Sequence, residues 1–343
     1  MPLKTKVLLR VDASAVIGYG HLMRCIGIAM HLLQNNVDVL FILHRSDSRA
    51  AELLKGKSMD YVLLNNEREI LQHASRDGQL IITDINTPVL FATNDVYTDY
   101  LRMLKQYNFK VISFEETGVR AMPSDVVVVP YVGAVTPEEK GRTTYLVGPD
   151  YFIFREEFLR SSKVVVREEV DRLFVCMGGT DPDHITEKVI GFLGKMKRLF
   201  HLDIVFAAID ESRRSAIEKL LNSYQGTFTM HVNPKSMSSL ISKSDIGIIN
   251  SGLTKYETSL LGLPCITLSN HAQHEPIMRL FAEKGSILHL GLAETLTDDV
   301  FAPKMTELVT NTGLRQSMSS NGIALCDGKG QERIHHTIQQ LLN

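Results

Sequence analysis

The sequence lacks a strong charge of either sign, and it lacks long apolar runs. Its 37 Lys and Arg residues nearly balance 39 Asp and Glu residues, which gives a formal net charge of -2. This balance implies neither nucleic acid nor an anionic membrane as an obligate partner. No apolar run approaches the roughly 18 residues that a membrane-spanning helix needs, so we expect no transmembrane segment. The hydrophobic share of 44% is ordinary for a globular protein.

Cysteine is scarce as well. The four Cys residues are far apart and show no C-x-x-C spacing, which predicts free, buried thiols in a reducing cytosol. The chain enters an apolar run at Val7 without the long apolar core of a signal peptide, so we expect a cytoplasmic protein. His271 and His274 have no third ligand nearby, and no P-loop or G-x-S-x-G motif is present. We therefore expect neither a metal nor a cofactor.

Short apolar runs alternate with helical patterns along the chain, as in βα units with buried parallel strands. The alternation breaks near positions 148–150 and then restarts. We predict an α/β protein of two doubly wound, Rossmann-like domains, 1–150 and 151–328, that face each other across an interdomain cleft. In such architectures a last amphipathic helix, here 329–343, can cross back onto the first domain. The predicted strands are Val7–Val11, Val39–Leu43, Leu80–Thr83, Val111–Phe114, Val126–Val129, Leu173–Met177, Ile204–Ala207, Thr227–His231, Ile246–Ile249, Cys265–Leu268 and Ile287–Leu290.

The first chemically informative segment, positions 10–24, reads R-V-D-A-S-A-V-I-G-Y-G-H-L-M-R. A strand ends in it and a helix begins close to His21, so Gly18 and Gly20 lie in the connecting loop. Glycine lets the backbone approach a ligand and adopt positive φ. The positive end of the helix dipole favours the neutral imidazole that a general base needs. We predict that His21 is catalytic, with Gly18, Gly20 and Arg24 around the substrate. The structural alternative is an exposed histidine on a tight turn.

Two features of this segment leave alternatives open. Arg10 and Asp12 form a buried pair that shapes the loop, or else Asp12 orients His21 or contacts a sugar hydroxyl. The loop is not a dinucleotide fingerprint, because the third glycine of G-x-G-x-x-G would fall at Met23. Arg45, after the second strand, could meet a 2′-phosphate, so an NADP enzyme is a further alternative.

The second segment, positions 176–183, reads C-M-G-G-T-D-P-D and follows the first strand of the C-terminal domain. Gly179 and Thr180 lie in a donor-rich turn that suits a diphosphate. Asp181 or Asp183 can cap the helix that follows.

The third segment, positions 250–257, reads N-S-G-L-T-K-Y-E between a strand and a helix. A helix N-terminus presents backbone N–H groups to a phosphate. We predict that Ser251, Gly252, Leu253 and Thr254 hold phosphate oxygens and that Glu257 binds the ribose of a nucleotide-sugar. The alternative is a capping box, in which these side chains only close the helix.

Gln273 and His274 follow the next strand and begin another helix. They are predicted to contact the sugar or a diphosphate oxygen. A polar helix start is the structural alternative.

Three motifs occur in an order that resembles one group of proteins: R-x-D-A-S…G-x-G-H-x-x-R, G-G-T-D-P and S-G-x-T-x-x-E-x-x-x-L-G-L-P. This group contains the UDP-sugar hydrolases of pseudaminic-acid biosynthesis and the spore-coat polysaccharide (SpsG-type) glycosyltransferase-like proteins. It is more distantly similar to the UDP-GlcNAc transferase of peptidoglycan synthesis. The similarity runs from about Lys6 to Gly285, and positions 148–158 also look like the spore-coat branch.

The resemblance implies a GT-B fold that holds a UDP-sugar. It implies that His21 is the catalytic histidine and that Glu257 binds the ribose. It further implies diphosphate contacts at Gly179, Thr180, Ser251, Gly252 and Thr254, and a uracil near Val232 and Met237.

The sequence also departs from the hydrolases. They carry Asp-x-Tyr after the fourth strand, where this chain has Asp84-Ile85-Asn86. A paired aspartate and an Asn-Gln pair are replaced by Glu115-Glu116 and Gln273-His274. The residues that match the hydrolases therefore belong to the nucleotide half of the implied site, and the residues that differ belong to the sugar half.

We expect an enzyme that cleaves the anomeric C–O bond of a UDP-sugar and releases UDP. The leading interpretation is a UDP-sugar hydrolase in nonulosonic-acid or surface-polysaccharide biosynthesis. The alternatives are a GT-B glycosyltransferase with a hydroxyl acceptor and a non-catalytic nucleotide-sugar-binding subunit. The expected partner is the UDP-sugar itself, and the sequence does not address the sugar or the oligomeric state.

Overall fold

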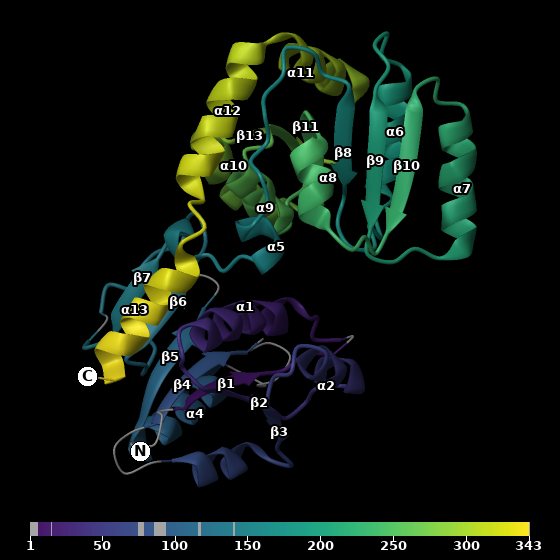
Figure 1. Cartoon of the computed structure of the whole chain (residues 1–343). Helices are drawn as coiled ribbons and strands as arrows, with labels where there is room; N and C mark the ends of the chain where they lie inside the picture. Colours follow the sequence, from purple (N-terminus) through teal and green to yellow (C-terminus); the bar gives the residue numbers. More distant parts are fainter. Residues whose placement is uncertain are drawn as a thin grey trace. The chain divides into compact units, whose positions relative to one another are not determined.

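The computed structural model describes residues 6–14, 16–74, 79–85, 94–115, 118–139 and 141–342 (Figure 1). The chain divides into two compact units. Unit 1 comprises Met1–Arg155 and Gly328–Asn343, and unit 2 comprises Glu156–Asp327. Asn86 and Glu116, which belong to two of the departures from the hydrolase pattern, lie outside the described residues.

Unit 1 is built on a parallel sheet of seven strands within its described part, in the order β3-β2-β1-β4-β5-β6-β7. The four-residue run of valines in β6 and the fully buried β1 and β2 show why these segments are strands, because β-branched residues pack well on a sheet covered on both faces. The strands are β1 (Val7–Val11), β2 (Val39–Leu43), β3 (Tyr61–Leu63), β4 (Gln79–Asp84), β5 (Phe109–Phe114), β6 (Val126–Val129) and β7 (Thr144–Val147).

Helices cover both faces of this sheet. On one face, α1 buries Leu22, Ile26, Ala29 and Leu32 at helical spacing, and α2 and α13 join the same core. On the other face, η1 and α4 pack over the alternate side chains of the strands. The helices of unit 1 are α1 (Gly20–Gln34), α2 (Ser48–Lys55), η1 (Glu67–His73), α4 (Asn94–Gln106), η2 (Pro149–Tyr151) and α13 (Gly330–Leu342).

Unit 2 repeats the architecture with six parallel strands in its described part, in the order β10-β9-β8-β11-β12-β13. This is the order of a doubly wound dinucleotide-type sheet. The strands are β8 (Arg172–Cys176), β9 (His201–Phe206), β10 (Thr227–Val232), β11 (Ile246–Asn250), β12 (Cys265–Ser269) and β13 (Ile287–Leu292).

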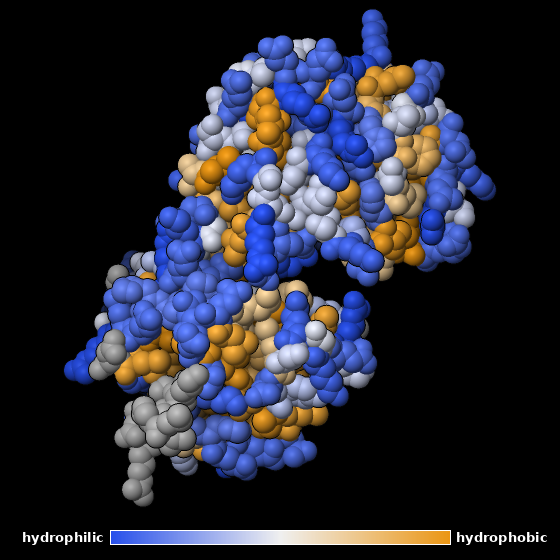
Figure 2. All heavy atoms as spheres, in the orientation of Figure 1, coloured by the Kyte–Doolittle hydropathy of each residue, from blue (hydrophilic) through white to orange (hydrophobic). Residues whose placement is uncertain are grey.

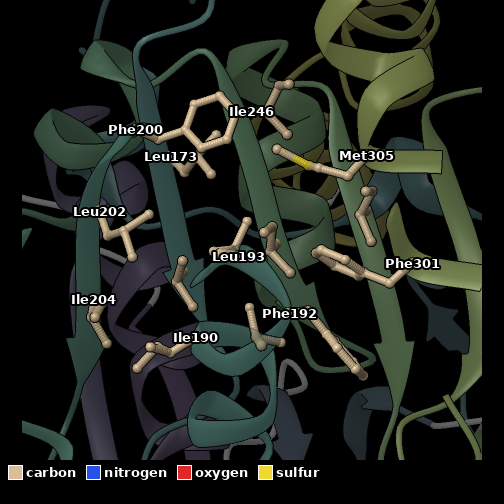
Figure 3. Close-up of a cluster of buried hydrophobic side chains, with 14 of the residues drawn as sticks. Leu173, Ile190, Phe192, Leu193, Phe200, Leu202, Ile204, Ile246, Phe301 and Met305 are labelled. Carbon is tan, nitrogen blue, oxygen red and sulfur yellow. The ribbon is translucent and has the colours of Figure 1, made fainter. Parts of the chain in front are cut away.

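The larger core of unit 2 lies between the sheet and the helices α6, α7 and α11. Figure 3 shows Leu173 and Ile204 of the sheet in one cluster with Phe192 of α6 and Phe301 of α11. The Phe192 and Phe301 rings stack with centroids 5.1 Å apart, and each such buried side chain contributes about 1.5–3 kcal/mol. The helices are α5 (Glu156–Leu159), α6 (Ile185–Gly194), α7 (Glu211–Asn222), α8 (Met237–Lys243), α9 (Thr254–Leu261), η3 (Ala272–His274), α10 (Glu275–Glu283), α11 (Asp298–Thr310) and α12 (Thr312–Leu325).

The predicted α/β class with two doubly wound parallel sheets is confirmed. Strands β3 and β7 were not predicted from the sequence. They are short strands at the two edges of the unit 1 sheet and are less buried than the others. All four cysteines are free and buried, as predicted. Among the described residues no helix is long and apolar enough to cross a membrane. Hydrophilic side chains dominate the visible face of each unit, and apolar ones appear between them as separate patches (Figure 2).

Each sheet reverses its strand order at one point, between β1 and β4 in unit 1 and between β8 and β11 in unit 2. In open α/β sheets, ligands bind outside the carboxyl ends of the strands at this switch point. The three segments singled out in the sequence follow β1, β8 and β11, so all three lie at switch points.

Candidate functional site

Asp84, the last residue of β4, is the centre of a polar cluster in unit 1. Its carboxylate is 1% exposed. Oδ1 lies 2.7 Å from Nδ1 of His21 and accepts a 2.6 Å hydrogen bond from a terminal nitrogen of Arg24, and Oδ2 accepts a 2.6 Å bond from Nε of Arg24. Arg24 thus donates to both oxygens of the carboxylate, and this bidentate geometry is the strongest for an arginine–carboxylate pair.

This contact decides the tautomer of His21. An ionised carboxylate only accepts hydrogen bonds, so Nδ1 must carry the proton. In the neutral imidazole the lone pair is then on Nε2, which has no hydrogen-bond partner among the described residues. The side chain of His21 is 19% exposed. The arrangement is that of a histidine held ready as a general base by a carboxylate.

The Arg24 side chain keeps Asp84 charged. Burial alone would raise the pKa of the Asp84 carboxyl, but the guanidinium of Arg24 and the contact with His21 hold this pKa well below its usual range. Arg24 also donates a 2.6 Å hydrogen bond to the hydroxyl of Tyr131 and lies 4.8 Å from the centroid of the Phe114 ring. These contacts fix the guanidinium in place.

The loop before α1 is built on a left-handed glycine. Gly18 has φ +84° and forms a bridge with Ser14, and its N–H donates to the carbonyl of Ser14 at 2.8 Å. Gly20 is exposed, and a Cβ there would meet nothing within 4 Å, so the fold itself does not require glycine at this position. Helix α1 has Tyr19 at its N-cap without a side-chain cap. Its first N–H groups are therefore not satisfied by a capping side chain.

Asp12 has a structural role. Its side chain is fully buried, and Oδ2 accepts a 2.7 Å hydrogen bond from Arg10. Oδ1 accepts from the backbone N–H groups of His44 and Arg45 and from the hydroxyl of Ser46. This corrects the prediction that Asp12 contacts the substrate and the alternative in which it orients His21. The buried-pair interpretation is the one that the structure supports, and Asp84 is the carboxylate at the histidine.

The loop after β8 in unit 2 also depends on glycine. Gly178 has φ +106°, and a Cβ there would lie 2.8 Å from Nδ2 of Asn250. Gly179 and Thr180 are exposed. Asp181 is buried and accepts from the N–H groups of residues 185 and 186 at the start of α6, at 3.1 and 2.9 Å. The predicted capping by one of the two aspartates is thereby confirmed.

Asn250 joins this loop to the one after β11. Its Nδ2 donates to the carbonyl of Met177 at 3.0 Å, and its Oδ1 accepts from the N–H of Gly252 at 3.1 Å. The side chain of one residue therefore holds together the two loops that the sequence assigned to the diphosphate. This linking role of Asn250 was not predicted from the sequence. An asparagine at the end of a strand at the switch point is the feature that could have indicated it.

Helix α9 begins without a side-chain cap. Its N-cap is Leu253, and Thr254 is already the first helical residue, so the capping box predicted as an alternative is not formed. The hydroxyl of Ser251 lies 2.8 Å from Nδ1 of His274 and does not cap the helix. Among the described residues the N–H groups of Leu253 and Thr254 have no hydrogen-bond partner. Unpaired N–H groups at a helix N-terminus are donors of the kind that bind anions.

Glu257 lies one turn into α9 and is partly buried. Burial first, and then the charge of Glu257, raise the pKa of the Cys176 thiol at the end of β8 to about 11. Glu257 is therefore close to the carboxyl end of the strand that leads into the Gly178–Thr180 turn. The structure brings together this glutamate and both loops.

The remaining predicted residues lie at the same strand ends of unit 2. Gln273 is exposed in η3. Burial first, and then His271 and Lys255, lower the pKa of His274. Val232 ends β10 and is 41% exposed, and Met237 begins α8. Their predicted contact with uracil stays a prediction. No cluster of three or more metal-ligating side chains occurs in the described ranges.

The fold defines the class of protein. MurG from Acinetobacter baumannii superposes with a TM-score of 0.71 at 13% identity over 98% of this chain and 99% of that one. A putative UDP-N-acetylglucosamine 2-epimerase from Listeria monocytogenes gives 0.63 at 12% identity over 98% and 96%. The chain therefore shares the two-domain GT-B fold of these structures. No family model matches the sequence.

Sequence comparison is more specific. The chain is 25% identical over 317 residues to the spore coat polysaccharide biosynthesis protein SpsG of Bacillus subtilis, which covers 85% of this chain and 92% of that protein. The chain is thus similar to SpsG over most of its length, as the motif order predicted. The likeness to the pseudaminic-acid hydrolases stays a prediction.

Proposed function

We propose that this protein is a UDP-sugar-dependent glycosyltransferase of surface-polysaccharide biosynthesis. Three observations support the proposal: the GT-B fold, the relation to SpsG, and two loops of unit 2 tied by Asn250 next to an uncapped helix. In the proposed enzyme the backbone amides of these loops hold the diphosphate, and Glu257 holds the ribose hydroxyls. Gln273 and His274 contact the diphosphate or the sugar.

The chemistry is a displacement at the anomeric carbon. Nε2 of His21 takes the proton from the acceptor hydroxyl while the acceptor oxygen bonds to that carbon. The bond from the carbon to the diphosphate oxygen breaks, and UDP leaves with the electron pair. The amides of unit 2 stabilise the charge that develops on UDP, and the Asp84 carboxylate stabilises the imidazolium that forms at His21.

The observation that carries the catalytic part of the proposal is the 2.7 Å contact between His21 and Asp84. It places a histidine at the start of α1, at the switch point of a sheet, with no hydrogen-bond partner for Nε2 among the described residues.

Hydrolysis is the second candidate. It is favoured by the loop of residues 10–24, whose pattern resembles that of the UDP-sugar hydrolases. Water then replaces the acceptor hydroxyl, His21 keeps the same role, and the products are UDP and free sugar, as a nonulosonic-acid pathway would require. The epimerases among the structural relatives share the fold at 12 to 15% identity, which does not extend to activity.

The test is incubation of the protein with UDP-GlcNAc and with UDP-glucose, with and without hydroxyl acceptors, followed by NMR of the products. UDP release that requires an acceptor supports the transferase, and free sugar in water alone supports the hydrolase. His21→Ala should abolish UDP release while UDP affinity, measured by calorimetry, stays within about twofold, since the imidazole acts only in the transition state. If the protein binds UDP but releases no UDP from either UDP-sugar under any of these conditions, it is a non-catalytic nucleotide-sugar-binding protein.

A further inference from the structure

Lys255 is an unusual residue for its position. It is the second residue of α9 and only 6% exposed. A cation at a helix N-terminus opposes the helix dipole, and burial of its charge costs further free energy. Stability alone thus disfavours lysine here on two counts. Violations of local rules of this kind concentrate at functional sites.

The ammonium of Lys255 binds the loop that precedes its own helix. Nζ donates to the carbonyl of Ser251 at 2.8 Å and to the carbonyl of Gly252 at 3.1 Å. It also lies 5.0 Å from the ring centroid of Tyr256 and 5.8 Å from that of Phe281. The charge is therefore compensated by peptide dipoles and aromatic faces, and among the described residues no carboxylate pairs with it.

These two hydrogen bonds control where the neighbouring N–H groups point. In a trans peptide the C=O and the N–H point in opposite directions, and the described residues contain no cis peptide. Because Lys255 holds the carbonyl of Gly252 toward the interior, the N–H of Leu253 points away from the ammonium. The Leu253 residue is 50% exposed, and this N–H has no partner among the described residues. A cation on the carbonyl also polarises the peptide and makes that N–H a stronger donor.

We propose that Lys255 is a positioning residue that aims the Leu253 amide at the diphosphate and that diphosphate affinity depends on its charge. This inference rests on the proposed function, in which the loop binds UDP. It assigns Lys255 no contact with the reacting atoms.

The charge of Lys255 is titratable near neutral pH. Burial lowers the pKa of Lys255 to about 8. The titratable groups that interact with it from packed elements are the thiol of Cys326, after α12, and His274, in η3. Glu257 follows on the same helix, and Lys163 donates to the carbonyl of Leu260 at the far end of α9. His274 has a lowered pKa, so between pH 7 and 9 it stays neutral.

The chain offers a matched control. Lys163→Met removes an Nζ–carbonyl bond of 2.6 Å on the same helix, but at its C-terminal end. Lys255→Met removes the ammonium at the N-terminal end and keeps an unbranched side chain of similar length. Each variant loses the hydrogen bonds between one lysine ammonium and backbone carbonyls in or next to α9. Only Lys255→Met releases the carbonyls of residues 251 and 252.

The experiment measures UDP binding to the full chain by calorimetry at pH 7, 8 and 9. We expect Lys255→Met to weaken UDP binding about tenfold at pH 7, the value of one charge-assisted hydrogen bond, and Lys163→Met to stay within about twofold. The ratio of the Lys255→Met and wild-type dissociation constants should shrink as pH rises through 8, because the wild-type ammonium is then lost. Titration of the nucleotide itself is common to both proteins and cancels in the ratio.

The outcomes separate the two proposals. Wild-type protein that binds no UDP overturns the proposed function. Wild-type protein that binds UDP, together with a Lys255→Met protein of equal affinity and a flat ratio, overturns the role of Lys255 and leaves the proposed function intact. If Lys255→Met does not fold, Lys255→Gln, which keeps N–H donors without the charge, replaces it. A Lys255→Gln protein with wild-type affinity at all three pH values overturns the inference equally.

Discussion

Asp84 ends β4, and Asp12 directly follows the neighbouring parallel strand β1, one residue beyond the register partner of Asp84, yet the two carboxylates have different partners. Asp84 pairs in register with Val11, the residue before Asp12. The Asp12 carboxylate is enclosed by Arg10 and by backbone N–H groups, whereas the Asp84 carboxylate contacts His21 and Arg24. One aspartate therefore supports the loop, and the other supports the candidate base.

Asp84→Asn should impair catalysis far more than donor binding. An asparagine can present either its oxygen or its NH₂ group to Nδ1 of His21, and it carries no charge to stabilise the imidazolium. We expect kcat for UDP release to fall by about 10²- to 10⁴-fold, with the UDP dissociation constant within about twofold of the wild type. Steady-state kinetics and calorimetry on the same preparation measure both. A kcat within threefold of wild type would contradict the role given to Asp84.

Asp12→Asn should act on stability. It leaves the buried guanidinium of Arg10 with only Glu67 as a charged partner and weakens four hydrogen bonds of Asp12. Breaking a buried ion pair costs about 3 kcal/mol, so we expect the free energy of unfolding in urea to fall by that order. At a temperature where the variant is folded, its UDP affinity should equal that of the wild type, because the diphosphate loops are in unit 2.

The sequence predicted the sheets better than the side-chain contacts. Buried strands such as β2 and β6 are continuous apolar runs, so their bounds follow from composition alone. The edge strands β3 and β7 span only three and four residues and are partly exposed, so their short apolar runs do not distinguish them from loops. Strand order comes from tertiary pairing, which periodicity does not encode.

The same limit explains the site residues. His21 was found because a glycine loop and a helix start mark it locally. Its partner Asp84 is 63 residues away and becomes its neighbour only because β4 pairs with β1. Asn250 and Lys255 were within a segment that the sequence singled out, but their contacts depend on how the two loops fold against each other. A hydrophilic lysine in a helical pattern is typical of an exposed face, and here it is buried.

The stabilising effect of Asp84 should persist to unusually low pH. The pKa of Asp84 in the folded protein lies below the ordinary value of about 3.9. Its contribution to stability is therefore fully present above the unfolded-state value and is lost as pH falls from about 4 through the folded-state pKa. The difference in unfolding free energy between wild type and Asp84→Asn should be constant from pH 7 to about 5 and shrink below pH 4. A difference that already declines between pH 7 and 5 would contradict the lowered pKa.

Gly178→Ala should destabilise the loop after β8, and Gly179→Ala provides the matched control. The φ of +106° at Gly178 is rarely adopted by L-residues, and the new Cβ would lie 2.8 Å from Nδ2 of Asn250. At Gly179 the nearest atom to a new Cβ is that of Ala207, at an ordinary 3.4 Å. We expect Gly178→Ala to lower the unfolding free energy by about 1–3 kcal/mol and to weaken UDP binding, because Asn250 must move and release the N–H of Gly252. Gly179→Ala should change stability by less than about 0.5 kcal/mol, so any loss of UDP affinity in that variant would come from the methyl group meeting the ligand. Equal unfolding free energies for the two variants in urea titrations would show that the contact with Asn250 does not constrain the loop.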